Sequence, residues 1–123
     1  MALSTITLSA RLGDKFAKET VATSTKSVVS ASSLTLFGVE INNSGNTAAP
    51  SYVKCFDKAT GAVTVGTTDP ELILVATAGA TVTYMFDQGI SFATGLVLAC
   101  VTGAGTAGTG DPSSSVVVKL IYT

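Results

Sequence analysis

Apolar and β-branched residues occur along the chain in short runs, separated by segments rich in glycine, serine and proline. The clearest run is TVTYMF at 81–86, where apolar and polar positions alternate as in a strand with one buried face. The same pattern predicts strands at about 6–10, 21–31, 34–42, 51–57, 62–66, 71–77, 80–86, 96–102 and 115–122. Residues 13–20, GDKFAKET, could form one helical turn, and no other segment favours a helix.

Regularly spaced short strands with turn residues between them indicate an all-β protein built from two packed antiparallel sheets. We expect a jelly-roll-like β-sandwich, with an immunoglobulin-like sandwich as the alternative. Immunoglobulin domains carry a characteristic tryptophan, and this chain has none. A chain of 123 residues is expected to be one domain. Residues 21–123 are predicted to form the sandwich. Residues 1–20 are predicted to form an N-terminal arm, which could be extended.

Two of the predicted strands are apolar on both faces. The run LVLACV at 96–101 contains no polar residue, and in 115–122 Val117 and Ile121 lie on the face opposite Val116, Val118 and Leu120. If one face of each strand fills the sandwich, the other needs a cover, and large exposed apolar patches usually mark partner surfaces. The pattern therefore predicts that the chain associates with copies of itself.

Charge and composition narrow the possible partners. Only 12% of the residues are charged and the net charge is −1, so the chain has no basic surface for nucleic acid. The longest apolar runs are far shorter than a membrane-spanning helix, and no signal sequence is recognisable, so we expect synthesis in a cytoplasm. The first 26 residues are mildly basic and could dock on an acidic neighbour. The candidate interface residues are Arg11, Lys15, Phe16, Lys18, Val117 and Ile121.

The residues that usually carry catalysis are scarce. Histidine is absent, which removes the serine triad and most zinc sites, and the carboxylates follow no metal-binding loop pattern. GAGTAG at 103–108 matches a phosphate-binding glycine pattern, but no helix follows it. Cys55 and Cys100 fit no zinc or redox motif and are expected to be buried free thiols. We therefore expect no enzymatic activity, no metal and no cofactor.

Three segments carry a resemblance to a known group of proteins. They are INNSGNTAAPSYVKCFDKATGAVTVGTTDPELILVATAGATV at 41–82, FDQGISFATGLVLACVTG at 86–103 and SSVVVKLIYT at 114–123. Together they resemble small virion proteins of tailed phages, cyanophages included. The resemblance implies a non-enzymatic capsid decoration (cement) protein, made in the host cytoplasm and located on the phage head surface. It further implies a homotrimer of β-sandwiches bound to the major capsid protein, with a terminal arm that latches neighbours.

A second hypothesis is a carbohydrate- or receptor-binding module of a phage tail or fibre. The loops at 42–47, NNSGNT, and 103–111, GAGTAGTGD, would then hold the ligand.

Overall fold

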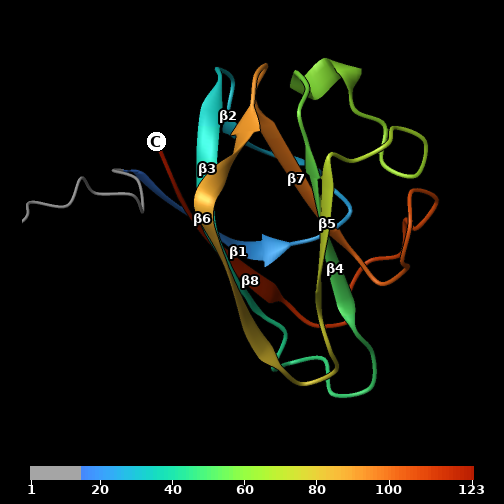
Figure 1. The fold of residues 1–123 in the computed structure, drawn as a ribbon. Coiled ribbons are helices and arrows are strands. Elements are labelled where there is room, and N and C mark those ends of the chain that lie inside the picture. The colour runs from blue at the N-terminus through green and yellow to red at the C-terminus, as the bar shows by residue number, and fades with distance from the viewer. Residues whose placement is uncertain (1–14) are drawn as a thin grey trace, which may run out of the picture.

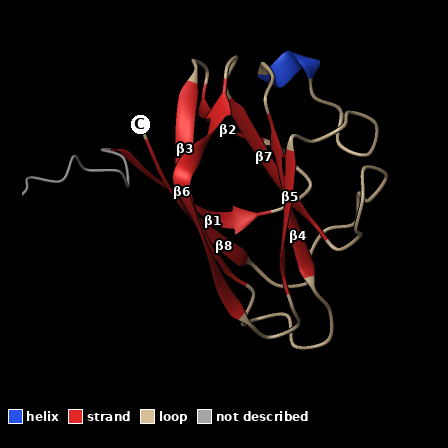
Figure 2. Ribbon diagram, viewed as in Figure 1, coloured by secondary structure: helices blue, strands red, loops and turns tan. Residues whose placement is uncertain are grey.

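The computed structural model describes residues 15–123, which form two four-stranded antiparallel sheets packed face to face (Figure 1). The first sheet has the order β1-β8-β3-β6 and the second the order β2-β7-β4-β5. The short 3-10 helix η1 (Thr60–Ala62) lies at one end of the molecule and is blue in Figure 2. The strands are β1 (Lys15–Ala22), β2 (Ser27–Ser30), β3 (Leu34–Asn42), β4 (Ser51–Phe56), β5 (Leu72–Ala76), β6 (Thr81–Phe92), β7 (Leu96–Val101) and β8 (Val116–Tyr122).

The strand pairing is that of a jelly roll. β1 pairs with β8, β2 with β7, β3 with β6 and β4 with β5, so the chain is one long folded hairpin wrapped into two sheets. The predicted two-sheet antiparallel sandwich is confirmed. The immunoglobulin-like alternative is wrong, because its first strand pairs with its second, whereas here β1 pairs with β8.

The core lies between the two sheets and is lined by the inward positions of nearly every strand. Both cysteines belong to it as buried free thiols, as predicted. Its buried members are Ala22, Leu34, Leu36, Val39, Ile41, Val53, Cys55, Leu74, Ala76, Phe92, Leu96, Leu98, Cys100, Val116, Val118 and Leu120.

Three local expectations from the sequence are wrong. The single strand expected at 21–31 is the end of β1, a turn and the separate strand β2 (Ser27–Ser30). Residues 15–20, predicted as arm or helical turn, are part of strand β1, because pairing with β8 buries the side of the strand that carries Ala17 and Ala22. Residues 62–66 are not a strand but the end of η1 followed by a turn. The strand expected at 6–10 lies outside the described residues, and no helix within 15–123 is long and apolar enough to cross a membrane.

Strand β6 continues further than expected because a glycine permits an irregular turn of its backbone. Between the pairs Gly38–Met85 and Leu36–Ile90, four residues of β6 lie opposite a single residue of β3. Gly89 in this stretch has φ +74°, and a Cβ there would lie 2.3 Å from the Thr35 methyl group. Only glycine suits that backbone and that space.

Candidate protein-association surface

The outer face of the second sheet is covered by the chain itself. Phe56, Val97 and Ala99 point away from the central core and pack with Val63 and the half-buried Val65. The covering segments are the β4–β5 and β7–β8 connections, which lie beside β4 and β5 in Figure 1. The second apolar face predicted for 96–101 therefore meets its own loops, and the expectation of a neighbouring copy on this strand is wrong.

A buried lysine holds one of these covering loops. The side chain of Lys54 on β4 is fully buried, and its Nζ donates to the carbonyl oxygens of Thr106 at 2.9 Å and Gly108 at 2.7 Å. Burial lowers the pKa of Lys54 below its ordinary value. The glycine-rich segment at 103–108 is thus a loop fixed over the sheet and not a phosphate-binding turn.

The other covering segment is held in a similar way. Nζ of Lys26 donates to the carbonyl oxygens of Thr60, at 2.8 Å, and Val63. The two covering loops also contact each other, since the Thr106 hydroxyl donates to the Asp69 carboxylate at 2.8 Å. These bonds hold the loops over β4 and β7, while Val28 on β2 of the same sheet is 49% exposed.

The first sheet, in contrast, has an open outer face. The strand registers place Phe16, Ile121, Gly38 and Met85 in one line across β1, β8, β3 and β6, which we call the apolar row. Phe16 is 62% exposed and Met85 53% exposed, so both ends of the apolar row project into solvent. Apolar side chains with this exposure in adjacent register form a candidate docking surface.

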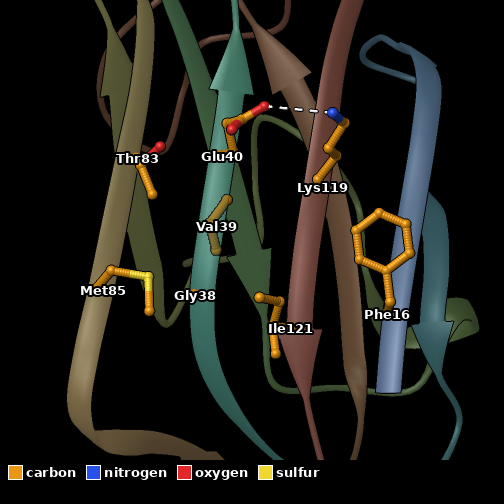
Figure 3. A pocket seen from close by; sticks show the side chains of 8 residues that line it. All are labelled: Phe16, Gly38, Val39, Glu40, Thr83, Met85, Lys119 and Ile121. Atoms are coloured by element: carbon orange, nitrogen blue, oxygen red, sulfur yellow. Dashed lines mark ion pairs between the residues drawn. The ribbon is translucent and has the colours of Figure 1, made fainter. Parts of the chain in front are cut away.

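A shallow hollow of about 180 Å³ lies in the middle of this face (Figure 3). Gly38 forms part of it because it has no side chain between Ile121 and Met85. A Cβ at position 38 would approach the sulfur of Met85 to 3.0 Å. The hollow is therefore a notch in the apolar row, flanked by larger side chains on both sides.

The next row on the same face is charged. The registers align Lys18, Lys119, Glu40 and Thr83 across the four strands, and we call this the charged row. Nζ of Lys119 lies 3.6 Å from a carboxylate oxygen of Glu40, and both side chains are about 40% exposed (42% and 39%). Figure 3 shows this ion pair beside the hollow. Lys18 lies opposite Lys119, a like-charge neighbour that a single carboxylate only partly compensates.

The residues predicted as an interface divide into three groups. Phe16, Lys18, Val117 and Ile121 share the open face. Lys15 pairs with Tyr122, whose side chain packs against the core, so Lys15 lies on the other side of strand β1. Arg11 lies outside the described residues.

Sequence reasoning missed several members of this face: Gly38, Glu40, Met85 and Lys119. Met85 could have been found, because it interrupts the polar positions of the alternating run at 81–86. Lys119 lies between Val117 and Ile121 on the same face of one strand, so the alternation at 115–122 already places it there. For Gly38 and Glu40 no local signal exists, because only the strand register brings them beside Phe16 and Ile121.

In the loop at 42–47, one of the two assigned to a carbohydrate in the second hypothesis, the side-chain amides of Asn43 and Asn46 are engaged internally. Asn43 is fully buried, and its side-chain nitrogen donates to the carbonyl oxygens of Ala49, Ala76 and Thr77. Its side-chain oxygen accepts bonds from Asn46 at 2.8 Å and the Ser51 hydroxyl at 2.7 Å. This hub fixes the loop at 42–47, and its amide groups do not face solvent.

Within residues 15–123, no group of three or more histidine, cysteine, aspartate or glutamate residues is arranged to hold a metal ion. No family model, curated protein or solved structure matches the chain.

Proposed function

We propose that this chain is a structural virion protein that binds and stabilises the exterior of a phage capsid as a non-enzymatic decoration protein. One observation carries the proposal: the outer faces of the two sheets differ in how far the chain itself covers them. In the second sheet, β4 and β7 are covered by the chain's own loops, while the described residues 15–123 leave the apolar row and the hollow of the first sheet uncovered. A face of this kind is suited to protein contacts.

The resemblance in the sequence supports the same proposal. In it the open face serves contacts between copies, for which the resemblance implies a homotrimer. The basic residues at the start of the chain, Arg11 and Lys15 among them, would contact the major capsid protein of the phage head. Repetition of a modest contact across a capsid lattice adds avidity to each individual interface.

The experiment is to look for the chain in purified particles. Peptide mass spectrometry should detect it in particles banded by density, and the purified protein should rebind to particles from which it has been stripped. A Phe16→Ser variant should rebind more weakly if the open face contributes to attachment. Absence of the chain from particles, together with failure of the purified protein to bind them, would refute the proposal.

A further inference from the structure

We propose that the open face of the β1-β8-β3-β6 sheet binds the same face of a second copy across a twofold axis that runs parallel to the strands between β8 and β3. This inference rests on the self-association that the proposed function assigns to this face, but it replaces the homotrimer implied by the resemblance with a twofold pair. It names the partner, a second copy of this chain, and specifies which rows meet.

The geometry of such an axis follows from the strand order. Rotation about a line between the two central strands places β8 opposite β3 of the second copy and β1 opposite β6 of the second copy. This rotation does not change the position of a row along the strand direction. The apolar row therefore meets the apolar row, and the charged row meets the charged row. Aligned sheets pack with an angle of about 30° between them, so the central strands are in closest contact.

The apolar row is complementary to itself under this rotation. Ile121 on β8 faces the notch at Gly38 on β3 of the second copy, and the same contact occurs in reverse. Phe16 faces Met85 of the second copy, an aromatic ring against a thioether, which is a favourable contact. The two most exposed side chains of the row would thereby be covered.

The charged row is complementary as well. Lys119 faces Glu40 of the second copy, so the ion pair within each chain becomes a ring of four charges with alternating sign. The second carboxylate also approaches the Lys18–Lys119 pair, where one chain alone supplies a single Glu40. Rows matched in this way favour one register over others, because a shifted register would put lysine against the apolar row.

The area limits the strength of the pairing. A third row, which contains Val117 opposite Asn42, completes this face. Four strands about 4.8 Å apart and three rows about 7 Å apart give roughly 400 Å² in each copy, about half of a standard interface. We therefore expect a reversible dimer that forms at micromolar to submillimolar concentration, and not an obligate one.

The test uses the full chain and two variants with opposite charge changes. Sedimentation equilibrium from low micromolar to about 0.5 mM should show the wild type moving from monomer to dimer. Glu40→Lys makes the central positions of the charged row uniformly positive, and Lys119→Glu makes them uniformly negative, so each variant alone should remain monomeric. Their equimolar mixture should form a heterodimer, because lysine again faces glutamate across the axis at both positions.

Controls separate this geometry from general attraction between unlike net charges. Glu71→Lys and Lys58→Glu carry the same net-charge changes at exposed positions away from the open face, and each should self-associate like the wild type. All four variants should melt near the wild-type temperature, since exposed charges contribute little to folding. Gly38→Ala fills the notch and should weaken association about tenfold, since overfilling a packed contact is unfavourable.

The outcomes are distinct. A wild-type monomer throughout the concentration range, a wild-type trimer, or a charge-variant mixture that stays monomeric would each overturn the twofold pairing. None of these results bears on whether the chain is found in particles, so the proposed function stands or falls on its own experiment.

Discussion

Replacing Lys54 by methionine is the sharpest test of how the second sheet is covered. Methionine keeps a long unbranched side chain but removes the ammonium group that donates to Thr106 and Gly108. The loop at 103–110 would then lose its bonds to strand β4. Because these two carbonyls are only partly buried, the loop can move outward and let water reach them.

Two opposing effects set the magnitude. Each hydrogen bond from a charged donor contributes about 1.5–3 kcal/mol, while burial of an ammonium group without a carboxylate costs several kcal/mol. The desolvation cost therefore offsets only part of what the two bonds contribute, and we expect Lys54→Met to lower the free energy of unfolding by roughly 1–3 kcal/mol. The loop at 103–110 should become susceptible to protease before the rest of the chain.

The pH dependence gives a second, independent readout. Because burial lowers the pKa of Lys54 in the folded state, the unfolded chain binds more protons in the interval between that pKa and 10.5. The free energy of unfolding of the wild type should therefore rise relative to Lys54→Met as pH increases through this interval. The neutral amine still has two N–H groups for the same two carbonyls.

Urea unfolding, limited proteolysis and amide exchange of residues 103–110 measure these effects. Lys58→Met, at an exposed position after β4, is the control and should change neither stability nor protection of the loop. Unchanged or increased stability of Lys54→Met, with a loop that remains protected, would contradict the assigned role of Lys54.

Three further predictions concern the core and the polar hub. Phe92→Ala removes a fully buried ring and should lower the free energy of unfolding by about 3–5 kcal/mol in urea titrations; a loss below about 1 kcal/mol would show that Phe92 is not tightly packed. Asn43→Ala leaves several buried groups without partners and should cost about 3–5 kcal/mol, whereas Asn42→Ala, which loses one exposed bond to a backbone amide, should cost under about 1 kcal/mol; similar values for both would contradict the hub. Burial raises the pKa of Cys55 and of Cys100 to about 12, so above pH 9 each thiol loses its proton only in the unfolded chain. Each thiol should therefore lower the free energy of unfolding by about 1.4 kcal/mol per pH unit above pH 9. Replacing both cysteines by alanine should abolish this slope between pH 9 and 11. A slope that persists in the double variant would assign the alkaline loss to other groups.

The sequence predicts most strands well because their apolar positions follow the two-residue repeat of a pleated sheet. The strand at 34–42 agrees with the structure at both ends, and those predicted at 51–57, 96–102 and 115–122 differ by one residue at an end. The failure at 62–66 has a physical reason. Val63 is buried and Val65 half-buried because they lie over the face of a sheet, and an alternating pattern cannot distinguish that position from a paired strand.

The association surface could be predicted only in part, since its residues come from four strands. Val117 and Ile121 were found because they share one strand whose second face is too apolar for solvent. Gly38 and Glu40 could not be found, because their neighbours are set by the register of β3 against β8. The same limit applies to Lys54, whose acceptors lie more than fifty residues away in the chain.

The strands of the first sheet depart from the usual pattern of an exposed sheet face at the proposed interface. An antiparallel sheet with one face in water carries polar residues outward, and β6 follows this rule at Thr81 and Thr83. The rule is broken at Phe16 on β1, Val117 and Ile121 on β8 and Met85 on β6. Three of these four residues lie in one register row, around Gly38, the position of that row without a side chain. Three strands therefore share one constraint, which the proposed contact with a second copy at that row would supply.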